Sequence, residues 1–218
     1  MTYSRRAILA TGATGTLALT AGCLDFVLGN GPMELTAERV APTDAALEAA
    51  GYDEYEIEER SIEETIEVGV ERDVEARVWS SIYSKDVEHR GIEHEGAFFV
   101  AVSIPDFSVL GRSFNPISEM TNDELLEEFL SEIDSDHTDV DDISKVDSFT
   151  LDILGDGRTV DVFEGESEFE GEPVDIEIPV ASFGHEDDLI VLLGSYPAAL
   201  AEESANAEKL MESVEHPV

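Results

Sequence analysis

The sequence predicts an α+β fold: a single domain in which helices pack on an antiparallel sheet, in the manner of an α/β/α sandwich. Two observations predict it. Apolar residues alternate with a period of two over several segments, which indicates half-buried strands. Shorter segments repeat apolar residues at helical spacing, and they do not alternate regularly with the strands. Residues 34–218, about 185 positions, suit one domain with a sizeable core.

The first predicted elements are short, and long strands follow them. Residues 35–40 predict a strand, and Thr43 predicts the N-cap of a helix over 44–50 that Gly51 ends. Alternation then predicts antiparallel strands at 54–60, 64–71 and 74–84. The continuous apolar run 97–104 predicts a central strand covered on both faces.

The C-terminal half predicts helix, strand meander and helix. Thr121 and Glu124 form a capping box, and the apolar face of its helix holds Leu125, Leu126, Phe129, Leu130 and Ile133. An acidic loop is expected at 134–142. Further strands are expected at 148–154, 159–164, 173–182 and 189–193, with a hairpin turn at 155–157. Pro197 is expected to open the last helix.

The charge of the chain restricts its solvent and its partners. It holds 51 acidic and 12 basic residues, a net charge of −39, and the acids recur in every segment from Glu34 to Glu215. Self-repulsion on this scale opposes compaction unless salt screens it, and near molar salt the Debye length is about 3 Å. Because 42% of the residues are hydrophobic and periodic, a disordered chain is disfavoured. The charge indicates a hypersaline medium and excludes nucleic acids as partners.

The N-terminus resembles a targeting signal. Arg5 and Arg6 precede a short apolar run, which closes on L-T-A-G-C at Cys23, the one cysteine of the chain. This resembles the signal of a Tat-exported lipoprotein. The resemblance implies a signal peptide over 1–22, a lipid attached to Cys23, a tether over 23–33, and a position on the extracytoplasmic face of the membrane. With Cys23 committed to lipid, disulfides and cysteine-based metal or catalytic sites are excluded.

A wider resemblance covers most of the chain. The signal, the acidity and the order G-D-G-R-T-V followed by L-I-V-L-L-G-S-Y-P are similar to an uncharacterised haloarchaeal family of Tat-exported lipoproteins. It implies no activity. From residue 97 onward the order of elements loosely resembles PsbP-like α/β/α sandwich domains, a topological likeness that transfers no site residue.

Catalytic signatures are not apparent in the sequence. The His-Glu pairs at 94 and 185 lack the second histidine that a zinc protease helix places one turn later. Gly194-Ser195-Tyr196-Pro197 is not a nucleophile elbow. We therefore expect a non-enzymatic envelope lipoprotein that binds a ligand or a protein partner. An extracytoplasmic hydrolase with an unrecognised site is the alternative.

Two segments are candidate binding sites. Residues 107–116 contain no acid, and this contrast predicts either a recognition loop or a segment buried in the domain. Its contact residues would be Phe107, Leu110, Arg112 and Phe114. The second candidate is the carboxylate group Asp134, Asp136, Asp139, Asp141 and Asp142, which predicts either a Ca²⁺ or Mg²⁺ loop or a solvated acidic loop. No other cofactor is expected.

Overall fold

The structure is a computed structural model that describes residues 32–67, 71–89, 92–106, 108–109, 112–113, 117, 120–132, 140–169 and 172–218. Its strands are β1 (Met33–Thr36), β2 (Ala41–Pro42), β3 (Asp53–Glu67), β4 (Glu71–His89), β5 (Ile92–Pro105), β6 (Ser108–Val109), β7 (Arg112–Ser113), β8 (Val140–Ile153), β9 (Asp156–Phe169), β10 (Glu172–His185), β11 (Asp188–Pro197) and β12 (Val214–Glu215). Its helices are α2 (Asp44–Ala50), α3 (Asn122–Glu132) and α4 (Ala201–Glu212). None of these helices is long and apolar enough to cross a membrane.

The described chain divides into two compact units. One comprises residues up to 35 together with 61–77, and holds most of β1 and the adjoining ends of β3 and β4. The other comprises 36–60 and 78–218 and holds the remaining elements. In this larger unit the strand order is β4-β5-β11-β10-β9-β8, with β3 also paired to β4. The β4–β5, β5–β11, β11–β10, β10–β9 and β9–β8 pairs are all antiparallel.

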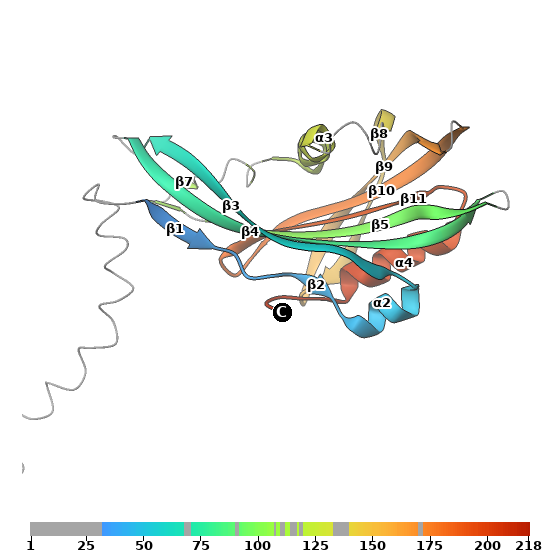
Figure 1. Ribbon diagram of the computed structural model, residues 1–218, viewed down its shortest axis with the longest axis horizontal. Coiled ribbons are helices and arrows are strands. Elements are labelled where there is room, and N and C mark those ends of the chain that lie inside the picture. The colour runs from blue at the N-terminus through green and yellow to red at the C-terminus, as the bar shows by residue number, and fades with distance from the viewer. Residues whose placement is uncertain are drawn as a thin grey trace, which may run out of the picture. The chain divides into compact units, whose positions relative to one another are not determined.

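The central strands of the larger unit bury both faces, as the apolar runs predict. In β5, Phe99 packs in one core cluster and Val100 in the other, and Leu192 and Leu193 of β11 divide in the same way. The first cluster includes residues of α2 and α4, and the second includes Leu126 of α3. Figure 1 accordingly shows α2 and α4 on one face of these strands and α3 on the other.

The predicted fold class is wrong. Strands dominate the structure, and it is not an α/β/α sandwich of the kind that the PsbP-like resemblance implied. The helices have 7, 11 and 12 residues, whereas β3, β4 and β5 have 15, 19 and 14. Helices this short do not form continuous layers over strands this long, because a helix rises only about 1.5 Å per residue against about 3.3 Å for a strand.

The predicted helix starts are confirmed where side chains cap them. Thr43 accepts a hydrogen bond from the Ala46 N–H, and Gly51 ends α2 with φ of 77°, a conformation that glycine adopts without strain. Glu124 accepts from the Thr121 N–H at 2.9 Å, as the capping box predicts. The last helix differs from its prediction, because Pro197 still pairs with Ile176 and α4 begins at Ala201.

Several strands are longer than predicted. Residues 54–60 and 64–71 were expected as separate strands, but 53–67 form one strand, because no glycine or proline interrupts the segment. The acidic segment expected as a loop to residue 142 already pairs as β8 from Val140, and Val140 and Ile143 pack against the second core cluster. The β8–β9 hairpin is confirmed, but its turn lies at Leu154 and Gly155 and not at 155–157, because Asp156 and Gly157 already pair with β8. Both turn residues have positive φ, as in a type I′ turn.

Candidate functional site

A cleft in the larger unit is the best candidate site. It is an open cleft of about 580 Å³, and its lining comprises Arg39, residues 41–44, Leu47 and Glu48 of α2, residues 52–54, Tyr83, Glu215 and Val218. This volume lies in the range of small-molecule sites in proteins. We call it the Arg39 cleft.

A buried carboxylate fixes the backbone that carries Arg39. Asp188 at the start of β11 accepts a hydrogen bond from the Glu38 N–H at 2.8 Å. Ser103 of β5 donates its hydroxyl to the Glu38 carbonyl oxygen at 2.6 Å. These two bonds fix the N–H and the carbonyl group of Glu38, the residue before Arg39. The Val218 N–H in turn donates to the Arg39 carbonyl oxygen at 3.0 Å.

His216 completes this backbone support. Its Nε2 lies 3.0 Å from Asp188 Oδ2 and 3.2 Å from the Glu38 carbonyl oxygen. Both neighbours are acceptors, so Nε2 carries the proton and donates. Burial raises the pKa of the Asp188 carboxyl, and the hydrogen bonds from Glu38 and His216 act against that rise. His216 Nδ1 is buried and has no partner among the described residues.

The Arg39 guanidinium is held by neutral hydroxyls. Its Nε donates to Ser81 Oγ and its Nη2 donates to the Tyr83 hydroxyl, both at 3.1 Å. Burial raises the pKa of Tyr83, and the neighbouring guanidinium lowers it in part. Within the described part of the chain, no carboxylate forms an ion pair with Arg39. An arginine offers five N–H donors, so donors remain for a further acceptor in the cleft.

Tyr52 lines the cleft, and a buried polar cluster on α4 and β4 holds its hydroxyl. Its hydroxyl donates to Glu203 of α4 at 3.2 Å. Glu203 is buried, and it also accepts from Lys85 Nζ at 2.5 Å and from Asn206 Nδ2 at 3.2 Å. Burial, together with the charge of Glu203, raises the pKa of Tyr52. The tyrosine therefore stays neutral, and its hydroxyl is fixed at the lining of the cleft by Glu203.

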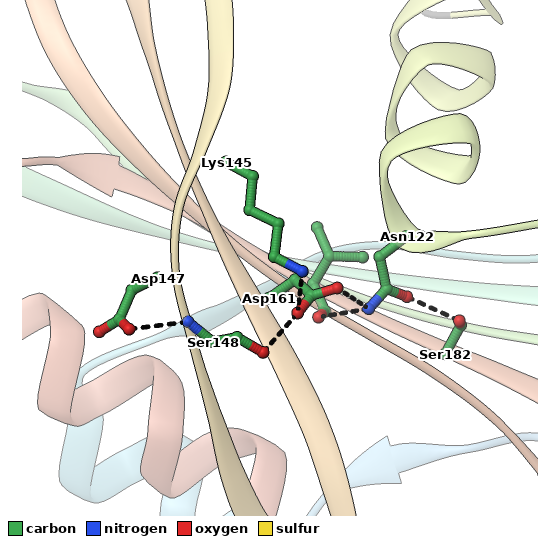
Figure 2. A network of polar contacts seen from close by, with 7 residues as sticks. Asn122, Lys145, Asp147, Ser148, Asp161 and Ser182 are labelled. Carbon is green, nitrogen blue, oxygen red and sulfur yellow. Dashed lines mark hydrogen bonds and ion pairs between the residues drawn. The ribbon is translucent and has the colours of Figure 1, made fainter.

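A second polar cluster, the Asp161 network, lies on β8, β9, β10 and the start of α3 (Figure 2). Asp161 accepts from Lys145 Nζ at 2.7 Å, from Ser148 Oγ at 2.7 Å and from Asn122 Nδ2 at 3.0 Å. Asn122 Oδ1 in turn accepts from Ser182 Oγ at 2.7 Å. The Asp161 carboxylate accepts from Lys145 and Asn122 as well as from Ser148, and Asn122 belongs to α3, so we assign the network to docking α3 on the sheet.

The sequence-predicted sites are placed in part. Arg5, Arg6, Cys23, Phe107, Leu110, Phe114, Asp134, Asp136 and Asp139 lie outside the described residues. Arg112 lies in β7, where it pairs with Val109 of β6. Asp141 and Asp142 lie in β8 and not in a loop, because that segment pairs with β9. Among the described residues, no group of three or more histidine or acidic side chains is placed to hold a metal ion.

Sequence reasoning missed the residues of the Arg39 cleft. Arg39 lies 42 positions before Ser81 and 44 before Tyr83, so the three residues form no local motif. One signal was available: the chain has 12 basic residues against 51 acidic ones, so an arginine next to apolar residues, as Arg39 is next to Val40, is unusual in this sequence.

The comparisons with known proteins place the chain in a family without assigning an activity. The sequence matches none of the curated proteins with which it was compared. One family model, that of a domain of unknown function, matches residues 39–215, which include the Asp161 network and every lining residue of the cleft except Val218. This chain belongs to that family, DUF6517.

Proposed function

We propose that this protein is a non-enzymatic, lipid-anchored binding protein of a haloarchaeal cell envelope, exposed on the extracytoplasmic face, and that it binds a small ligand in the Arg39 cleft. The twin arginines, the apolar run and Cys23 support the export and the anchor, and the charge of −39 supports the hypersaline setting. The binding function rests on one observation, which is that Arg39 lines a cleft and forms no ion pair with any carboxylate among the described residues.

Arg39 differs in its partners from most other basic residues of the described structure. Among the basic residues of the described structure, Arg60, Arg77, Lys85, Lys145 and Arg158 form ion pairs with acids. Lys209 is exposed on α4, whereas Arg39 is half-buried at the cleft. In a chain so rich in acids, an oriented guanidinium without a carboxylate is suited to receive an acceptor from outside the chain.

The binding function is tested with the lipid-modified protein purified from membranes in molar salt. Small molecules released by denaturation are identified by mass spectrometry and compared between wild type, Arg39→Gln and Lys209→Gln. The two variants lose the same charge, but only Arg39 lines the cleft. We expect Arg39→Gln to lose a species that wild type and Lys209→Gln retain. Identical profiles for all three proteins would contradict a ligand site at Arg39.

The anchor is tested separately. Cys23→Ser removes the thiol that would carry the lipid, so the variant should leave the membrane fraction. Substituting Arg5 and Arg6 together by lysine should block export. Wild-type protein in the culture medium with an unmodified Cys23 would contradict the anchor.

A further inference from the structure

The Arg39 cleft carries a more specific inference, which rests on the proposed binding function. We infer that its ligand is zwitterionic: it has a carboxylate that binds Arg39 and a cationic amino group that contacts the acidic rim. Two features of the cleft support it: the Arg39 guanidinium has free donors, and the other charged groups of the lining are negative.

The guanidinium determines the anionic end of the ligand. Ser81 and Tyr83 occupy Nε and Nη2 with one hydrogen bond each, and the described residues present no acceptor for Nη1. These two neutral partners fix the plane of the guanidinium, and none of the described carboxylates forms an ion pair with it. A planar guanidinium with free donors matches a carboxylate in both geometry and charge.

The rim requires a positive charge on the same ligand. Five carboxylates line the cleft with Arg39: Asp44, Glu48, Asp53, Glu54 and Glu215. All five are exposed, and with one arginine they leave the lining with a negative charge. A simple anion would gain one favourable partner and face several like charges. If the ligand also has a cationic amino group, the rim carboxylates that repel its carboxylate attract that amino group.

Salt makes direct contact necessary at both ends. Near molar salt, charges more than about 3 Å apart in solvent are largely screened, so a diffuse negative field does not by itself retain a cation. Hydrogen-bonded ion pairs at contact distance keep most of their strength. Leu47, Tyr52 and Tyr83 also line the cleft, and their apolar atoms can contact a short hydrocarbon chain.

The test uses the full-length protein, constant molar NaCl and titration calorimetry. The probes are two ω-amino acids of different length, β-alanine and ε-aminocaproate. Each is compared with its amine-free carboxylate, propionate or caproate, and with its carboxylate-free amine, ethylamine or pentylamine. Chloride stays constant because it competes for the guanidinium. We expect at least one ω-amino acid to bind about tenfold or more tightly than both of its matched probes.

Two matched pairs of variants assign each end of the probe. Arg39→Gln should weaken the ω-amino acid about tenfold or more and leave the amine unchanged, whereas Lys209→Gln should change neither. Glu54→Gln should weaken the ω-amino acid and the amine together. Glu212→Gln, an equally exposed acid of α4 outside the cleft, should weaken neither.

The outcomes separate this inference from the proposed function. If a carboxylate or an amine alone binds as tightly as its ω-amino acid, or if Arg39→Gln leaves the ω-amino acid unaffected, the zwitterion inference is wrong. If none of the probes binds while a native species still co-purifies in an Arg39-dependent way, the inference also fails and the proposed function stands.

Discussion

Replacing Lys85 with methionine should destabilise the protein strongly, because the change leaves a carboxylate buried without its charge partner. Glu203 is 1% exposed and forms its ion pair with Lys85 Nζ at 2.5 Å. Removing one partner of a buried ion pair costs about 3–5 kcal/mol. The Lys85 side chain is 21% exposed, so we expect the lower end, about 3 kcal/mol in the free energy of unfolding. Urea unfolding followed by circular dichroism in molar NaCl measures this without changing the ionic strength.

Lys145→Met is the matched control for this prediction. Lys145 pairs with Asp161 at 2.7 Å, but its side chain is 47% exposed, and Asp161 keeps its bonds from Ser148 and Asn122. Such a pair contributes up to about 1 kcal/mol. Adding Glu203→Gln to Lys85→Met should recover much of the loss, because the amide oxygen still accepts from Tyr52 and no charge is buried. Equal losses in Lys85→Met and Lys145→Met would refute the reasoning.

Three further predictions follow from the other polar groups and from the charge. Burial acts to raise the pKa of Asp161, but hydrogen bonds from Lys145, Ser148 and Asn122 outweigh it, and the pKa lies below its ordinary value of 3.8. Asp161 therefore stabilises the fold above about pH 4 and loses this effect as pH falls through its folded pKa. In urea unfolding, Asp161→Asn should lower the free energy of unfolding by about 1–3 kcal/mol at pH 7 and by less at pH 3. An equal loss at both pH values would contradict this. Asp188→Ala frees the Glu38 N–H and His216, so calorimetry should find weaker ω-amino acid binding while far-ultraviolet circular dichroism stays unchanged; unaltered affinity would refute this positioning role. Lowering NaCl from molar to about 0.1 M lengthens the Debye length to about 10 Å and should lower the thermal midpoint, and an unchanged midpoint would argue against a halophilic protein.

Local signals predicted the elements that local chemistry determines. Thr43, Gly51 and the pair of Thr121 and Glu124 act within one helical turn. The structure confirms the two caps of α2 and the bond from the Thr121 N–H to Glu124, whereas the Thr121 hydroxyl donates to the Glu124 carboxylate. Strand ends and fold class were harder, because pairing decides them. Val140 and Asp141 look like part of an acidic loop in the sequence, but Ser167 and Glu166 of β9 pair with them and extend the strand. Pro197 resembles a helix start until Ile176 pairs with it.

The candidate site depends on contacts that no local pattern contains. Ser81 and Tyr83 point to Arg39 from β4, more than forty residues along the chain, and Asp188 reaches Glu38 across 150 residues. In β4, Ser81 and Tyr83 lie two positions apart and so share a face of the strand, which the alternation of a strand predicts. Nothing in the sequence indicates that Arg39 lies against that face. The contrast between one arginine and many acids could have selected the residue, but not its partners.

The polar support around Arg39 argues for recognition rather than for stability alone. An acid close enough to neutralise Arg39 would be easy to place in a chain with 51 of them, and Asp188 is already hydrogen-bonded to the neighbouring residue. Yet Asp188 is occupied by the Glu38 N–H and His216, and the guanidinium receives hydroxyls instead. The buried Asp188 carboxylate orients the backbone, and the Ser81 and Tyr83 hydroxyls orient the Arg39 guanidinium. The guanidinium is thus a rigid donor group that has no ion-pair partner among the described residues. This is the preorganised state from which a carboxylate ligand gains most, because the protein has little left to order when the ligand binds.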